Sequence, residues 1–129
     1  MATLKISDLS VGDWVQNDNG DYSKVEGIWQ GCNFSYQVDH LRAGVLGTIT
    51  PCNLHPIPIT AEMLERNGFE RLLERDLFYH SESGLEVAFE DGEWMHTINL
   101  HEYTIHTISG VHHIQHLLRL YGCEKEINL

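Results

Sequence analysis

The first half of the chain has the period-two pattern of apolar and polar residues that is typical of short β-strands. Residues 34–41, FSYQVDHL, alternate aromatic or aliphatic side chains with polar ones. An Asn19–Gly20 pair between two apolar stretches predicts a hairpin turn. Residues 47–59 continue as a strand that contains three prolines, which suits the edge of a sheet. A sheet of several short strands in so few residues can bury its apolar face most easily if it closes into a barrel. We therefore expect residues 1–58 to form a small SH3-like β-barrel.

A short helix is predicted to follow this lobe, over residues 61–67. Thr60 is a favourable N-cap, and Ile59 and Leu64 occupy the two positions of a hydrophobic staple. Gly68 can adopt the left-handed conformation that ends a helix. Two helical turns are not stable alone, so we expect this helix to pack against a sheet.

The second half of the chain returns to strand-like alternation. The apolar residues Leu85, Val87 and Phe89 fall on one face of a predicted strand. The dipeptides Ser-Gly at 83–84 and Asp-Gly at 91–92 mark turns between neighbouring stretches. We therefore expect a four-stranded antiparallel meander, whose strands lie within residues 76–81, 84–90, 93–100 and 102–108.

A second helix is predicted after the meander. Ser109 can cap its start and Gly122 can end it. Its apolar residues recur at helical spacing and form one stripe that should cover the meander, made of Val111, Ile114, Leu117, Leu118 and Tyr121. Residues 123–129 are expected to fray. The fold class is therefore α+β, with a helix–meander–helix lobe at 59–129 that packs against the barrel or continues it as one domain.

Charge narrows the classes of partner. The 129 residues carry 8 basic and 19 acidic side chains, which gives a formal net charge of −11. Nucleic-acid binding is disfavoured, because phosphate recognition needs a basic surface and the basic residues here are scattered. An acidic surface fits a basic protein partner and, as a weaker alternative, a protein that mimics nucleic acid.

The cellular compartment can be predicted from composition as well. No apolar run approaches the roughly 20 residues that span a membrane, so no membrane partner is expected. The first ten residues lack the apolar core of a secretory signal. The three cysteines are odd in number and widely spaced, which favours reduced thiols over a disulfide framework. We expect a cytoplasmic protein without a cofactor.

Three segments resemble the shared motifs of a family of small proteins from gut bacteria and their phages or mobile elements. DLSVGDWV at 8–15 is similar to D-L-R-I-G-N-W-V, and IPITAEMLERNGFE at 57–70 is similar to I-P-x-T-x-E-x-L-x-x-x-G-F-E. VHHIQHL at 111–117 is similar to V-H-x-L-Q-x-L. Position by position, the resemblance marks Gly12, Trp14, Pro58, Thr60, Leu64, Gly68, Phe69, His112, Gln115 and Leu117.

The resemblance implies an architecture and an origin rather than a reaction. No activity is assigned to that family, and most of the marked positions are the caps, staples or core residues predicted above. The resemblance therefore favours a non-enzymatic interaction or accessory protein of a bacterial mobile element or phage.

Nine histidines in a chain of this length raise the alternative of a histidine-based metal-dependent enzyme. His112 and His116 lie four residues apart on the predicted helix, a spacing that can hold a metal ion. His96, His101 or His106 could supply further ligands. Only His112 matches the family motif, so such a site would be particular to this chain.

Two other patterns approach known metal motifs without matching them. HEYTIH, from His101 to His106, has a spacing of five in a strand-like segment, whereas H-E-x-x-H needs a spacing of four in a helix. Cys52 and His55 with Cys32 supply three of the four ligands that a structural zinc site needs. Both are weaker metal hypotheses than the His112–His116 pair.

The three tryptophans offer one more hypothesis about binding. Trp14, Trp29 and Trp94 all fall in predicted strands. Aromatic side chains on a small barrel can form a groove for proline-rich ligands, although packing in a core is their commoner role. The sequence leaves open the partner, the groove and any activity.

Overall fold

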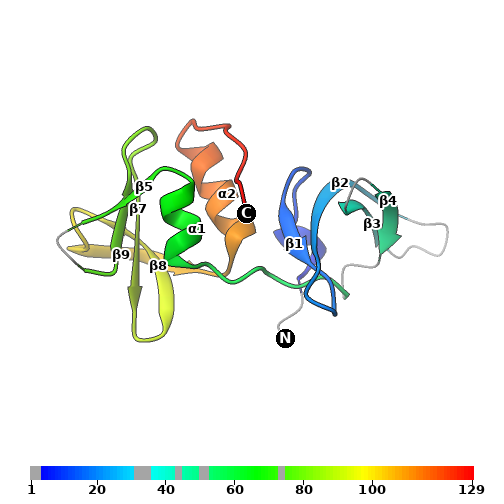
Figure 1. Ribbon diagram of the computed structural model, residues 1–129, viewed down its shortest axis with the longest axis horizontal. Helices are drawn as coiled ribbons and strands as arrows, with labels where there is room; N and C mark the ends of the chain where they lie inside the picture. The colour runs from blue at the N-terminus through cyan, green and yellow to red at the C-terminus, as the bar shows by residue number, and fades with distance from the viewer. Residues whose placement is uncertain (1–3, 31–35, 43–44, 50–52, 73–74) are drawn as a thin grey trace. The chain divides into compact units, whose positions relative to one another are not determined.

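The computed structural model describes residues 4–30, 36–42, 45–49, 53–72 and 75–129. The chain divides into two compact units, residues 1–57 and 58–129. Each unit contains one antiparallel sheet, and two α-helices accompany the sheet of unit 2. The fold class is therefore α+β, as expected (Figure 1). Neither helix in the described ranges has the length and apolar character that crossing a membrane requires.

Unit 1 is built on a four-stranded antiparallel meander. Asn17 closes the predicted first hairpin, because its side-chain oxygen accepts hydrogen bonds from the backbone N–H groups of Asn19 and Asp21. The elements are the 3-10 turn η1 (Ile6–Asp8) and the strands β1 (Trp14–Gln16), β2 (Tyr22–Gln30), β3 (Tyr36–Arg42) and β4 (Val45–Ile49). Among the described side chains, the buried core contains Leu4, Leu9, Val15, Val25 and Leu54.

The structure does not show the closed barrel expected for residues 1–58. Among the described strands, β1 and β4 stand at opposite ends of the strand order and do not pair with each other. Residues 53–57 are the described part of the proline-containing stretch that follows β4. Their β-pairing is limited to a single bridge between His55 and Gln16. Prolines lack the N–H group that a continuous ladder needs, which explains why this stretch adds no further strand.

Unit 2 contains the predicted meander with one strand more. The strand order is sequential, and the added strand β5 pairs Phe69 with His80 of β6. Figure 1 shows the two helices beside each other, next to this sheet. The elements are α1 (Ala61–Arg66), β5 (Phe69–Arg71), β6 (Leu77–His80), β7 (Leu85–Glu90), β8 (Glu93–Ile98), β9 (Tyr103–Ile108) and α2 (Val111–Leu120).

Both ends of α1 are confirmed. The Thr60 hydroxyl accepts a hydrogen bond of 3.1 Å from the backbone N–H of Met63, as an N-cap does. Gly68 has a φ of +88°, the left-handed conformation predicted for it. Ile59 and Leu64 are buried, as expected for a hydrophobic staple.

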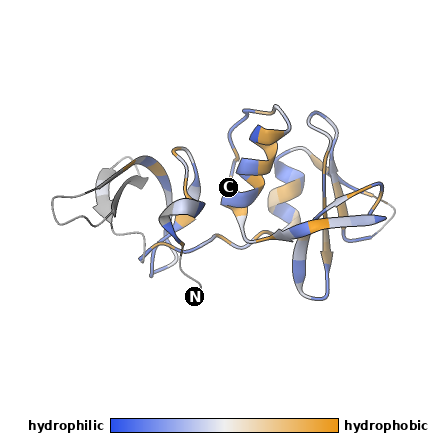
Figure 2. Cartoon of the chain, turned by 180° about the vertical axis from the view of Figure 1, so that it is seen from behind, coloured by the Kyte–Doolittle hydropathy of each residue, from blue (hydrophilic) through white to orange (hydrophobic). Residues whose placement is uncertain are grey.

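The predicted apolar stripe of α2 packs inward, with Tyr121 at its partly exposed end. Figure 2 shows hydrophobic and hydrophilic positions alternating along both helices. The predicted cap at Ser109 is wrong, because the N-cap residue is Gly110, which has no side chain that could accept a hydrogen bond. Instead, the Nδ1 atom of His113 accepts a hydrogen bond of 3.2 Å from the backbone N–H of Ser109. At the other end Gly122 has a φ of +84°, as predicted.

The prediction that residues 123–129 fray is also wrong. The Asn67 side chain, at the end of α1, forms two hydrogen bonds with the backbone of Asn128, of 2.8 and 2.7 Å. Ile127 is 3% exposed, so its side chain belongs to the core of unit 2. A pair of reciprocal amide hydrogen bonds mimics a step of β-pairing, and it fixes this segment to α1. We refer to residues 123–129 as the C-terminal segment.

Replacing Gly68 by alanine should destabilise the protein by about 1–2 kcal/mol, because a left-handed φ is unfavourable for any residue with a Cβ. The added Cβ would also lie 3.3 Å from Nε2 of His80. Gly84→Ala is the matched control, since its φ is +87° and no atom of the described residues lies within 4 Å of the new Cβ. Urea unfolding should show the larger loss for Gly68→Ala. Equal losses would mean that the contact with His80 has no energetic effect.

Candidate functional site

The predicted metal pair, His112 and His116, lies on α2 with ring centroids 5.8 Å apart. His112 is buried and His116 is half-buried. Within the described ranges, neither belongs to a group in which three donor atoms of His, Cys, Asp or Glu lie within 4.8 Å of one another. The described residues therefore do not assemble a three-ligand site around this pair.

The further donors considered from the sequence separate into two places. His96 and His106 are paired residues of β8 and β9, with ring centroids 5.1 Å apart. The ring of His113 on α2 lies 5.0 Å from that of His106. His101 instead pairs with Glu90, with 2.8 Å between Nε2 and Oε2. The register of β8 and β9, which spacing along one element does not reveal, thus creates a row of three histidines, His96, His106 and His113, that was not predicted as a unit.

His96 is the buried member of this row. Its Nε2 atom lies 2.7 Å from the Tyr121 hydroxyl, and its Nδ1 atom has no hydrogen-bond partner among the described residues. Burial lowers the pKa of His96 below its ordinary value, and neighbouring His106 lowers it further, whereas Glu86 opposes the shift. His96 is therefore a neutral side chain near pH 7.

The remaining site residues predicted from the sequence are the zinc candidates Cys32, Cys52 and His55 and the tryptophans. Cys32 and Cys52 lie outside the described residues, and the Nε2 atom of His55 is 2.5 Å from Asp18. Trp94 donates a hydrogen bond of 3.1 Å from Nε1 to the Ile59 carbonyl, and its ring contacts Phe78 and Phe89. Trp94 is half-buried, and its indole group therefore links β8 to the residue that precedes the N-cap of α1.

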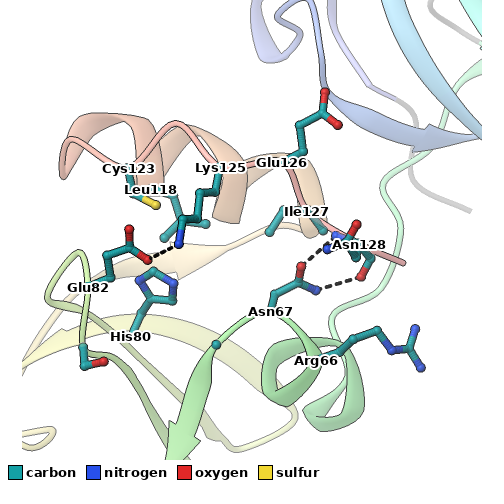
Figure 3. Close-up of a pocket in the computed structure, with 12 residues that line it drawn as sticks. Arg66, Asn67, His80, Glu82, Leu118, Cys123, Lys125, Glu126, Ile127 and Asn128 are labelled. Carbon is teal, nitrogen blue, oxygen red and sulfur yellow. Dashed lines mark hydrogen bonds and ion pairs between the residues drawn. The ribbon is translucent and has the colours of Figure 1, made fainter.

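A cleft of about 350 Å³ in unit 2 lies between the end of α1, β6 and the C-terminal segment (Figure 3). It gathers the one group of three potential metal donors in the described ranges, with donor atoms of His80, Glu82 and Cys123 within 4.8 Å of one another. Sequence reasoning did not find this group, because Cys123 is more than 40 residues from His80 and Glu82 and meets them only when the C-terminal segment docks.

The protonation and pairing of these side chains oppose cation binding. Lys125 donates a hydrogen bond of 2.8 Å to Glu82, which lowers the pKa of the carboxyl group and raises that of the ammonium group. Figure 3 shows Lys125 reaching across the cleft to Glu82. A bound metal ion would have to displace this ammonium group from the carboxylate.

The hydrogen bonds of His80 also oppose the binding of a metal ion. The backbone N–H of Ser83 donates to Nδ1 at 3.2 Å, so Nδ1 is an acceptor and the ring proton resides on Nε2. Burial is the main cause that lowers the pKa of His80, which keeps the ring neutral. Metal binding through Nε2 would move the proton to Nδ1, against the Ser83 N–H. The cleft is therefore best explained as the anchoring site of the C-terminal segment.

Glu86 of β7 organises the connection between β8 and β9. Although its side chain is acidic, Glu86 is only 5% exposed. Its carboxylate accepts a hydrogen bond of 2.5 Å from the Thr97 hydroxyl and bonds of 2.8 Å from the backbone N–H groups of Leu100 and His101. These bonds replace the water that a buried carboxylate loses.

The connection between β8 and β9 has an unusual backbone. Asn99, Leu100 and His101 have φ values of +54°, +56° and +67°. Left-handed φ angles cost residues other than glycine roughly 1–2 kcal/mol each. Two of these residues donate their N–H groups to Glu86. The carboxylate thus compensates the strain of the connection and sets the path by which the chain enters β9.

The β8–β9 hairpin presents four large apolar side chains to solvent. We call them the hairpin surface, which consists of Ile98, Leu100, Tyr103 and Ile105, with exposed fractions of 39%, 54%, 55% and 52%. A groove of about 440 Å³ adjoins it and is lined in part by Tyr79, Tyr121 and the first two of these residues. Ile98 and Tyr103 are paired across the hairpin, and clusters of exposed apolar side chains are typical of interaction sites.

Comparisons with protein-family models, with curated proteins and with solved structures found no match to the chain. The resemblance to a phage and mobile-element family therefore stays an expectation, and it rests on the three sequence motifs alone. The hairpin surface and its support by Glu86 remain as the candidate site that the structure itself defines.

Replacing Glu86 by glutamine should destabilise the protein by about 1.5–3 kcal/mol, the usual contribution of hydrogen bonds to a charged group. A glutamine oxygen can keep some of the three bonds, but its NH₂ group would face an N–H or O–H donor. Thr97→Val is the control, because it removes one of these bonds and leaves the carboxylate and both backbone donors. Chemical unfolding should rank Glu86→Gln as the more destabilised variant, and the reverse order would contradict the role of the carboxylate.

Burial of His96 predicts that stability falls in mild acid. Its folded pKa lies below the ordinary value of about 6.5, so below that pH the unfolded chain binds a proton that the folded chain excludes. The stabilisation is complete above about pH 6.5 and decreases as the pH falls through the interval down to the folded pKa. Urea unfolding at pH 7.5 and 5.5 should show this loss for the wild-type protein and a smaller loss for His96→Gln. Equal losses in the two proteins would exclude His96 as a source.

Proposed function

We propose that this chain is a non-enzymatic protein-interaction module, and that its partner docks on the hairpin surface. The single observation that carries this proposal is the exposure of Ile98, Leu100, Tyr103 and Ile105 within eight residues of one hairpin. Removing such a patch from water stabilises a complex by roughly 25 cal/mol per Å² of buried apolar area. A rigid connection held by Glu86 supports the same proposal, because a preordered surface loses little entropy on binding.

The two clusters that could have supported catalysis have structural explanations. The cleft at His80 anchors the C-terminal segment through Lys125 and Asn67. The row of His96, His106 and His113 packs β8 and β9 against α2. The motif resemblance adds an expected setting, an accessory protein of a bacterial mobile element or phage that acts in the cytoplasm.

Replacing Ile105 by lysine should abolish partner capture without unfolding the protein. Ile105 is about half exposed, so a charged side chain is tolerated in the free protein but would be buried unpaired in the complex. The experiment immobilises the purified chain, applies a lysate of the source organism and identifies captured proteins by mass spectrometry. Leu120→Lys is the matched control, since it makes the same charge change at a residue of α2 that is 80% exposed and outside the hairpin surface.

The outcomes separate the functional alternatives. A protein captured by the wild type and by Leu120→Lys, but lost with Ile105→Lys, supports docking on the hairpin surface. Capture that is equal for all three forms contradicts it. A captured protein that competing DNA displaces would favour the acidic nucleic-acid mimic, and a stoichiometric metal ion in untagged protein would favour the histidine-based enzyme.

A further inference from the structure

We infer that the partner docks as an extended segment that pairs with β9 and carries lysine or arginine side chains at its ends. This inference rests on the proposed function and adds the conformation and charge of the partner. The backbone of β9 argues for the conformation, and the distribution of carboxylates argues for the charge.

The strand β9 is an edge strand that is open to pairing. In the described part of the chain it pairs with β8 alone, and it ends the strand order of its sheet. A strand directs about half of its backbone N–H and C=O groups to each side, so the outer side of β9 presents such groups to solvent. A partner strand would satisfy these groups while its side chains contact Tyr103 and Ile105.

The other edge of the sheet shows how an edge is usually protected. There β5 has three residues and includes Glu70 and Arg71, and a short charged edge strand resists pairing. In contrast, β9 has six residues, YTIHTI, without lysine, arginine, aspartate, glutamate or proline. Ile105 is the extra residue of a bulge in the pairing with β8, and bulges commonly redirect a side chain at an edge. The bulge thus contributes to the exposure of Ile105.

The stretch of sequence that contains β9 carries only negative charge among side chains that are charged at neutral pH. From residue 76 to residue 118 the sequence contains seven carboxylates and no lysine or arginine, the carboxylates being Asp76, Glu82, Glu86, Glu90, Asp91, Glu93 and Glu102. Two exposed carboxylates flank the strand. Glu102 precedes its first residue, and Glu93 lies next to Trp94, which pairs with Ile108 at the other end. An apolar strand between two carboxylates complements a segment with an apolar middle and basic ends.

The same charges argue against a second copy as the partner. Antiparallel pairing of two β9 strands would bring Glu102 of each copy toward the Glu93 end of the other. Each copy also has a formal net charge of −11, so association would bring like charges together. A basic segment of another protein experiences attraction from the same groups.

The test selects peptides from a random twelve-residue display library on the immobilised full chain, with counter-selection on Ile105→Lys. The best binder is then synthesised in three forms: unmodified, N-methylated at the odd residues of its middle, and N-methylated at the even residues. Because alternate N–H groups of a paired strand face its neighbour, one methylated form should lose affinity by about tenfold or more, as expected for two or three lost hydrogen bonds. The other form should bind within about twofold of the unmodified peptide.

Selected peptides should be rich in lysine or arginine at their ends, and their affinity should fall when sodium chloride is raised from about 50 to about 300 mM. Acidic or uncharged peptides, or two methylated forms that bind equally well, would overturn this inference and leave docking on the hairpin surface intact. A dimer in sedimentation analysis that Ile105→Lys dissociates would assign the site to a second copy and overturn it too. Loss of Ile105-dependent capture in both the library and the lysate would overturn the proposed function as well.

Discussion

The carboxylate of Glu86 anchors the β8–β9 hairpin, because three consecutive left-handed residues follow β8 and two of them donate their backbone N–H groups to it. The same carboxylate accepts the hydroxyl of Thr97, so it links β7, β8 and the connection in one network. Buried charge is costly unless it is fully hydrogen-bonded, and here three donors replace the lost water. The exposure of the hairpin surface and the place of His106 opposite His96 both depend on the path that this network imposes on the chain.

Local sequence signals predicted the parts of unit 2 that depend on local physics. Thr60 and Gly68 end α1 where capping and left-handed φ place them, and the turns at residues 83–84 and 91–92 separate strands as expected. Glu86 could not be predicted, because an acidic residue that alternates with Leu85 and Val87 normally faces solvent. Its carboxylate is instead held by the connection between β8 and β9, through the N–H groups of Leu100 and His101. Docking of the C-terminal segment was missed for a similar reason, since it depends on Asn67, 61 residues before Asn128.

The features of the candidate site also divide into those that local spacing predicted and those that depend on contacts between elements. Spacing along α2 predicted that His112 and His116 share a face, and their rings are neighbours. The contact between His96 and His106 depends on strand register and could not be read from spacing along one element. Exposure of Tyr103 and Ile105 was also unpredictable, because alternation indicates which residues share a face but not which face a neighbour covers. Bulk charge, in contrast, is a property of the sequence alone, and the exposed carboxylates Glu93 and Glu102 at the two ends of β9 are part of it.

The clamp between Asn67 and Asn128 has a consequence for synthesis of the protein. Ile127 and Cys123 belong to the buried core, so unit 2 cannot complete its packing until the last of these residues has left the ribosome. At the usual rate of about 5–20 residues per second, translation from residue 58 to residue 128 takes roughly 4–14 seconds. During that time unit 1 can fold, whereas unit 2 still lacks the C-terminal segment that completes its core. The apolar surface of unit 2 is therefore exposed for longer during synthesis than it would be in a lobe without a late-docking segment.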